Sequence, residues 1–291
     1  SEGNYEDAIG INQRVVELYK QKLDPLHPKY AETINNLALL YWASGDNKRA
    51  YKFYEQNITN YVRQYKRYFP FLSEKEKGYF YDGIQLFFEE FNSFAIDQVN
   101  ANPEILGLMY NAEIATKSLL FHTSKEIRDH IGDNEVLINK YQRWVQVKEL
   151  LAKISKLDKS ELEKRGVDVE ALESTANYLE KEISLRVEKE KEKEESVFDV
   201  TWEDIRDYLK EGEAAVEIFQ FDYFRPDSGG VFENKSFYAA LIVTSQTKQH
   251  PEFVLLKNGH FLEAEALQSY KNFIQYQITD KVNYDHYLKP I

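Results

Sequence analysis

Apolar positions recur with helical spacing near the start of the chain and fall into two neighbouring groups. The first group is Ile34, Leu37, Ala38, Leu40 and Tyr41, and the second is Ala50, Phe53 and Tyr54. Spacings of three and four residues place each group on one side of a helix. Gly45 lies between the groups, and helices commonly end in a glycine with left-handed backbone. The pattern therefore predicts two helices joined by a short turn.

The same stretch contains an internal repeat. Gly3, Tyr5 and Ala8 recur as Gly45, Asn47 and Ala50, a shift of 42 residues. A fixed period of this size is typical of stacked supersecondary units. Small residues at positions 8, 38 and 50 would let paired helices approach closely.

Residues 73–196 follow a longer helical pattern. Ser73 precedes Glu76 by three residues, which predicts a capping box at a helix start. The apolar stripe behind it is Phe80, Ile84, Phe87, Phe88, Phe91 and Phe94. Two further long helices begin near Asn102 and Asn134, and the segment from Lys159 carries a fourth after an interruption at Arg165-Gly166. Four helices of this length predict an α-helical bundle, with the aromatic stripe in its core.

The pattern changes after residue 196. A short helix is predicted from a Thr201 cap. Three apolar runs of strand length follow, at Ala214–Phe221, Phe237–Thr244 and Phe253–Leu256, and a closing helix runs from Leu262 to about Tyr276. We expect a mostly α fold with a small C-terminal α/β piece of about three strands. The predicted parts are residues 1–72, 73–196 and 197–291.

The composition indicates a folded chain with an acidic surface. Of the 291 residues, 43% are hydrophobic, and the formal net charge is −12. Nucleic acid is therefore an unfavourable partner, because phosphate binding needs Lys and Arg. No apolar run approaches the roughly 18 residues of a membrane span, and no signal pattern is present, so we expect no membrane association and a cytoplasmic location. The start SEGNYEDA, without Met, suggests a fragment.

The repeat resembles the tetratricopeptide repeat, in the longer 42-residue variety found in kinesin light chains and many bacterial regulators. The matching residues are Gly3, Asn4, Tyr5, Ala8, the loop Asp24–Thr33, Asn35, Asn36, Leu37, Ala38, Leu40, Tyr41, Gly45 and Ala50. They cover about one and a half repeats. Because such stacks need about three units, the resemblance implies that residues 1–72 are the C-terminal end of a longer array.

Stacked repeats offer a concave surface lined by the first helix of each pair. In this chain that helix carries Asn35, Asn36 and Leu39, the candidate peptide-binding residues. Amide side chains at such positions can hydrogen-bond an extended main chain. The occupant is either a protein or peptide ligand, or another part of the same chain such as the adjoining helical region. The residues alone leave both open.

Residues from about 70 to 291 resemble the region that links tetratricopeptide repeats to the caspase-like protease core in the CHAT family. The segments that carry this resemblance are FLSEKEK, TWEDIRDYLKEGEAAVEIFQF, FYAALIVT, PEFVLL and YLKPI, in that order. In that family the core follows the last segment and holds a His-Gly dipeptide and a Cys. Cysteine proteolysis needs a thiolate and a histidine base, and this chain has neither Cys nor His-Gly. The resemblance implies an inactive fragment of a cysteine endopeptidase.

Nothing else in the sequence indicates a catalytic, cofactor or metal site. Gly229-Gly230 is more typical of a hairpin than of a phosphate-binding loop. His122 and His130 have no neighbouring carboxylate cluster that would complete a zinc site. We therefore expect no catalytic residue, no cofactor and no metal.

Three hypotheses for the function remain. The chain is an interaction and regulatory region of a bacterial repeat protein with a CHAT core, a stand-alone repeat adaptor or scaffold, or an enzyme of another class within residues 197–291. Without a following core, open strand edges or an exposed apolar face would also favour self-association.

Overall fold

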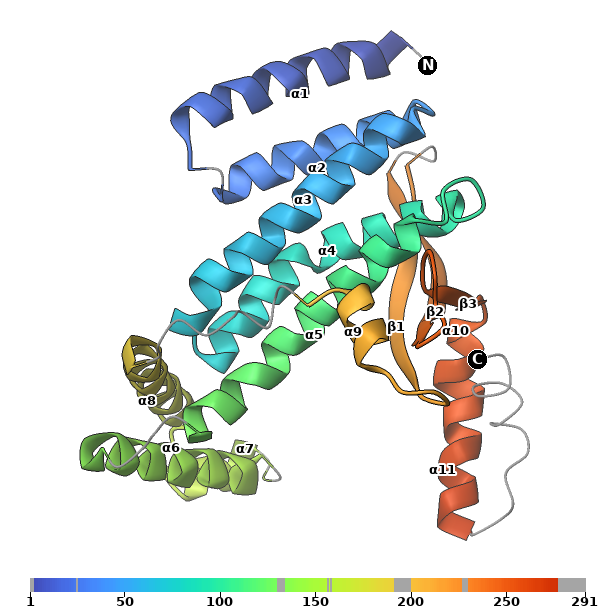
Figure 1. Cartoon of the computed structure of the whole chain (residues 1–291). Coiled ribbons are helices and arrows are strands. Elements are labelled where there is room, and N and C mark those ends of the chain that lie inside the picture. Colours follow the sequence, from blue (N-terminus) through green and yellow to red (C-terminus); the bar gives the residue numbers. More distant parts are fainter. Residues whose placement is uncertain are drawn as a thin grey trace. The chain divides into compact units, whose positions relative to one another are not determined.

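A computed structural model describes residues 3–24, 26–129, 134–155, 157, 159–190, 200–226 and 230–276 (Figure 1). The helices are α1 (Gly3–Lys22), α2 (Pro28–Ala43), α3 (Asn47–Tyr68), α4 (Glu74–Gln98), α5 (Ile105–Asp129), α6 (Glu135–Ile154), α7 (Lys159–Lys164), α8 (Val169–Glu190), α9 (Trp202–Tyr208), α10 (Gly259–Phe261) and α11 (Leu267–Tyr276). The strands are β1 (Ala214–Arg225), β2 (Val231–Thr244) and β3 (Glu252–Leu256). The fold is mostly α with a small C-terminal α/β piece, as predicted.

The described residues form two compact units, each assembled from distant segments of the chain. The first unit comes from Ser1–Val62, Gln85–Ala115 and Asp199–Ile291, and the second from Arg63–Ile84 and Thr116–Phe198. Helices α3, α4 and α5 contribute residues to both. The division into 1–72, 73–196 and 197–291 stays a prediction. Gly229, His130 and the segment YLKPI lie outside the described residues.

In the first unit, local signals define both ends of α2. The ring Nδ1 of His27 accepts a hydrogen bond from the amide of Lys29 at 3.2 Å, and a proline occupies the first helical position. At the other end Gly45 has φ +83°, and the amide of Asp46 donates to the carbonyl of Tyr41 at 2.8 Å. This left-handed cap satisfies carbonyls of the last turn. Gly45 therefore ends α2 as predicted, and His27 is a capping residue.

Helices α1, α2 and α3 lie one after another in the first unit (Figure 1). Ala38 of α2 and Ala50 of α3 are fully buried. The rings of Tyr41 and Phe53 stack with centroids 5.5 Å apart. Side chains this small let helix backbones approach closely, and the stacked rings fill the space beside them. The predicted helix pair is confirmed.

The aromatic stripe of α4 packs on α3. Phe87, Phe91 and Phe94 are buried, and their ring centroids lie 6.0, 5.6 and 4.9 Å from that of Tyr54. Tyr61 meets Phe87 one turn further along at 4.9 Å. Offset and tilted rings at these distances attract one another beyond the apolar area that they bury. The predicted role of the stripe as core is confirmed.

In the second unit, the start of α4 is closed by two carboxylates. Ser73 and Glu76 form the predicted capping box, in which Oε2 of Glu76 accepts from the amide of Ser73 at 2.9 Å. Oε1 of Glu180 on α8 accepts from the amide of Glu74 at 2.9 Å. Negative groups at a helix N-terminus are favourable because they face its unpaired N–H groups. Leu137 and Ile183 form the buried contact between α6 and α8.

The C-terminal strands form an antiparallel sheet in the order β1-β2-β3. The first two are longer than predicted, because Phe224 and Phe232 pair across them with centroids 5.0 Å apart. The predicted cap of α9 is present, since Oγ1 of Thr201 accepts from the amide of Asp204.

Candidate protein-binding site

The three predicted binding residues of α2 lie in different surroundings. Asn36 is exposed, whereas Asn35 and Leu39 are half-buried. Positions 35, 39 and 42 share one side of the helix, since they are separated by four and three residues. That side is turned toward α4, and Asn36 lies next to it in solvent. The structure therefore brings Asn35 and Leu39 together on one face and leaves Asn36 at its edge.

Asn35 is engaged by the same chain. Its Nδ2 donates a 2.6 Å hydrogen bond to Oε2 of Glu90 on α4, and its Oδ1 is buried without a partner among the described residues. Glu90 is itself buried, and burial raises the pKa of its carboxyl to about 7. The bond from Asn35 lowers this pKa in part, and the nearby charge of Glu89 raises it further. At this position the adjoining helix occupies the surface that a ligand was expected to use.

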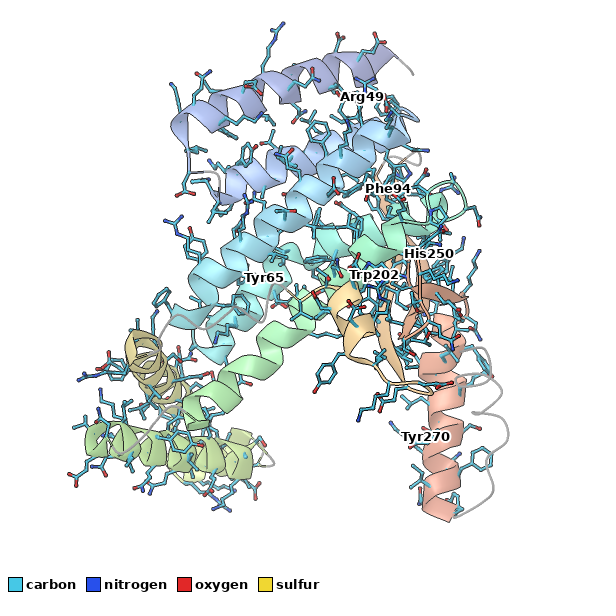
Figure 2. All side chains as sticks on the ribbon, in the orientation of Figure 1. Arg49, Tyr65, Phe94, Trp202, His250 and Tyr270 are labelled. Carbon is cyan, nitrogen blue, oxygen red and sulfur yellow. The ribbon has the colours of Figure 1, made fainter. Side chains whose placement is uncertain are left out.

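Trp42 continues the same face and was not selected from the sequence. Its indole is 8% exposed and meets the ring of Phe94 on α4, labelled in Figure 2, edge-on at 5.5 Å. On another side it faces the ring of Phe224 in β1 at 6.2 Å. Its spacing of seven residues from Asn35 was the signal that could have identified it.

A hollow lies between α1 and the turn that joins α2 to α3. Nε2 of Gln13 donates to the hydroxyl of Tyr41 at 2.8 Å, and the guanidinium of Arg49 lies 4.5 Å above the same ring. Arg49, labelled in Figure 2, also pairs with Asp46 at 2.5 Å. The Arg49 cation therefore already has a carboxylate partner, and Glu6 and Lys48 are the other charged residues that line the hollow.

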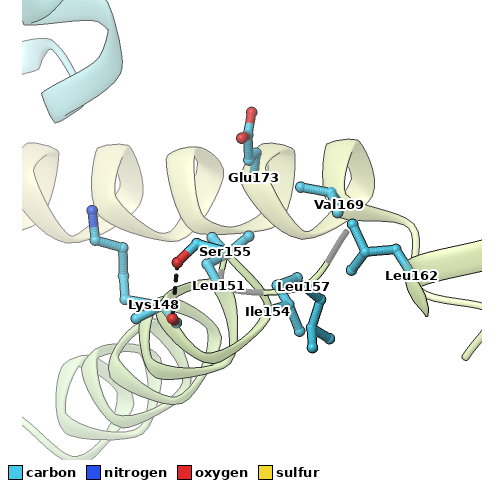
Figure 3. Close-up of a pocket in the computed structure, with 9 residues that line it drawn as sticks. Lys148, Leu151, Ile154, Ser155, Leu157, Leu162, Val169 and Glu173 are labelled. Carbon is cyan, nitrogen blue, oxygen red and sulfur yellow. Dashed lines mark hydrogen bonds between the residues drawn. The ribbon is translucent and has the colours of Figure 1, made fainter. Parts of the chain in front are cut away.

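A second hollow lies in the second unit, beside α6, α7 and α8 (Figure 3). Leu151, Leu162 and Val169 form its apolar wall. Its two charged residues are already paired, Lys148 with Glu74 at 2.7 Å and Glu173 with Lys75 at 3.0 Å. Apolar walls without convergent polar groups indicate a packing defect of a helical hairpin rather than a site of chemistry.

Across the part of the chain that the structure describes, no group of three His, Cys, Asp or Glu side chains is arranged to hold a metal ion. Within the same ranges, no helix is both long enough and apolar enough to cross a membrane.

Comparison with known proteins identifies the N-terminal helices. Residues 1–61 match the family model of the tetratricopeptide repeat. No curated protein and no solved structure matches the chain. The match covers α1, α2 and most of α3, the helices whose capping glycine, buried alanines and stacked rings are described above. Residues 1–61 are therefore similar to the tetratricopeptide repeat.

Proposed function

We propose that the chain is a protein-interaction module, which binds an extended protein segment along the face that α2 and α4 form in the first unit. The observation that carries this proposal is the match of residues 1–61 to the tetratricopeptide repeat, a family of protein-binding solenoids. Asn36 at the exposed edge of the face supplies a donor and an acceptor for a main chain. Half-buried Leu39 supplies apolar surface beside it, whereas Trp42 on the same face is covered by Phe94 and Phe224.

A peptide-display selection against the whole chain tests this function. Selected peptides should lose about fivefold or more in affinity when Asn36→Ala removes the amide, since one well-formed hydrogen bond contributes about 1 kcal/mol. Glu55→Ala, at an exposed position of α3, is the matched control and should leave the affinity unchanged. If the selected peptides bind Asn36→Ala and the unaltered chain with equal affinity, the binding site is not at the proposed face.

We further propose that the module regulates a caspase-like cysteine protease of the CHAT family. Two observations support this finer proposal: the order of the resembling segments, and the pairing of their apolar runs in one antiparallel sheet. The present chain should be proteolytically inert, because it has no Cys to act as nucleophile. Cleavage of a diverse peptide library by rigorously purified chain would contradict this.

The competing possibility is a stand-alone repeat adaptor. It predicts that the coding sequence beyond Ile291 contains no strands that carry His-Gly and Cys. A reading frame that continues into such strands would favour the protease, and one that stops would favour the adaptor.

A further inference from the structure

A segment of β1 lies on the proposed binding face. The amide of Phe224 donates a buried 2.9 Å hydrogen bond to Oγ of Ser93 on α4. The Phe224 ring is 5% exposed and faces Trp42 of α2. A main-chain hydrogen bond combined with a buried aromatic side chain is how a groove holds an extended peptide. Residues Asp222–Arg225 therefore engage the face in the manner expected of a ligand.

A β-bulge directs this segment toward α4. The pairing of β1 with β2 passes from Asp222 opposite Ser236 to Phe224 opposite Phe232, so one residue of β1, Tyr223, lies opposite three residues of β2, 233–235. Its hydroxyl donates to Oδ1 of Asp97 on α4 at 2.8 Å. Bulges turn a strand and re-aim its side chains. Because β1 is an edge strand, the Phe224 amide is available to Ser93.

One contact of the segment is unfavourable. Asp222 precedes Phe224 by two residues and Glu89 precedes Ser93 by one helical turn, so the Phe224–Ser93 bond brings this part of β1 alongside that part of α4. Burial and, to a smaller extent, the charge of Asp222 raise the pKa of the Glu89 carboxyl, whereas a bond from Gln85 lowers it. Two nearby carboxylates repel, and such a repulsive pair weakens one binder relative to a competitor without it. The segment therefore combines favourable aromatic and hydrogen-bond contacts with a built-in mismatch of charge.

We propose that Asp222–Arg225 is an internal occupant of the face formed by α2 and α4, and that the natural partner displaces it. The displacing segment of the partner is extended and carries a Tyr-Phe pair preceded by a neutral or basic residue. The main-chain bond to Ser93 and the pocket at Trp42 fit the aromatic residues, and Glu89 selects against an acidic residue before them. This inference rests on the proposed function. It specifies which residues the partner carries, and it implies that β1 covers the binding face when no partner is bound.

Competition in trans tests the proposal. The probe is a fluorescein-labelled peptide of residues 219–226, FQFDYFRP, and its anisotropy is titrated with the whole chain. A chain with Tyr223→Phe and Phe224→Ala should bind the probe about tenfold more tightly than the unaltered chain, because its own segment competes less well. Tyr238→Phe removes a hydroxyl bonded to Glu263, away from the face, and should behave like the unaltered chain.

A second peptide tests the charge preference. We call the Tyr223→Phe, Phe224→Ala variant the opened chain. Replacing the aspartate in the probe by lysine, FQFKYFRP, should tighten its binding to the opened chain by about fivefold, since the repulsion from Glu89 becomes an attraction. The gain should disappear when the opened chain also carries Glu89→Gln. Absence of probe binding by the opened chain, or equal affinity for both peptides, would overturn the proposal.

Hydrogen exchange provides a measurement on the unaltered chain that does not depend on the stability of a variant. Saturation with FQFKYFRP should accelerate exchange of the Phe224 amide, because its bond to Ser93 is replaced by that of the peptide. Unchanged protection at saturation would overturn the internal-occupant proposal. If display-selected peptides bind through Asn36 while Phe224 stays protected, the interaction function stands and only this further inference fails.

Discussion

Nδ2 of Asn35 and Oε2 of Glu90 lie 2.6 Å apart and join α2 to α4 through a buried amide and a buried carboxyl. The hydroxyl groups of Tyr54 and Tyr61 on α3 belong to the same interior, and the pKa of each phenol is raised chiefly by burial and also by the charge of Glu90. A charged carboxylate in these surroundings is costly, because one neutral amide replaces only part of its hydration.

Glu90 should make the stability of the chain depend on pH. The pKa of its carboxyl is raised from 4.5 to about 7 in the folded chain, so the folded state binds the proton more tightly than the unfolded state. Its contribution is fully present below pH 4.5 and is lost as the pH rises through about 7. Denaturant titrations between pH 4.5 and 8 should show this decline.

Glu90→Gln isolates this contribution. The substitution should raise the free energy of unfolding by roughly 1–3 kcal/mol at pH 8, because a neutral amide avoids the cost of burying a charged carboxylate. At pH 4.5 the buried carboxyl is protonated, so the gain should be much smaller. The introduced amide could also donate to the buried Oδ1 of Asn35. Glu55→Gln on the exposed side of α3 is the control. An equal effect at both pH values would show that Glu90 does not titrate in this range.

Ala38→Leu should destabilise the helix pair by about 1–3 kcal/mol, because a fully packed position has no room for the added methyl groups. Ala38 is 0% exposed on α2, on the side that carries Ala31 and Tyr41, both of which contact α3. Asn36→Leu introduces the same side chain at an exposed position of α2 and should change stability by less than about 0.5 kcal/mol. Thermal melts that do not distinguish the two variants would contradict the helix pairing.

Gly107→Ala should loosen the contact between α5 and α9. A Cβ at this position would come within 2.7 Å of Nε1 of Trp202, a buried indole that has little freedom to move. We expect a loss of about 1–3 kcal/mol and a change in tryptophan fluorescence. Gly83→Ala, at a helical position with nothing within 4 Å, should instead stabilise the chain by about 0.5–1 kcal/mol. The same sign for both glycines would contradict the packing.

Self-association remains a prediction, and β1 provides a way to test it. Val216 and Ile218 are 40% and 48% exposed on this edge strand. Light scattering should show a mean mass that rises above 34.3 kDa with concentration, and Val216→Lys should reverse the rise, because a lysine on an edge opposes strand pairing. Tyr208→Lys, at an 89% exposed position of α9, is the control. A single-chain mass at all concentrations would contradict the prediction.

Local signals predicted the elements well. The cap at Thr201, the capping box of Ser73 with Glu76 and the end of α2 at Gly45 are all formed by residues within a few positions of one another. Their geometry depends only on backbone and side-chain groups that are close in the sequence, so the residue types were sufficient. The burial of the aromatic stripe of α4 was also predictable, because its residues follow the spacing of a single helix.

The candidate site was predicted only in part. Asn35 was selected as a candidate for binding a peptide, and in the structure its amide bonds Glu90, which lies 55 residues away. The contact of Phe224 with Ser93 joins residues 131 positions apart, and it depends on a β-bulge that was not predicted from the sequence. Such contacts depend on how separate elements pack against one another, which the local residue pattern of a single sequence does not indicate.

The interleaving of the two compact units constrains how the chain can be made. The face of Trp42 and Phe94 is completed by Phe224, and the first turn of α4 is closed by Glu180, 106 residues after Glu74. During synthesis from the N-terminus, a domain normally folds once its own residues have emerged. Here the repeat helices leave the ribosome with aromatic surface uncovered until the strands follow. We expect nascent chains to be most prone to aggregation during that interval.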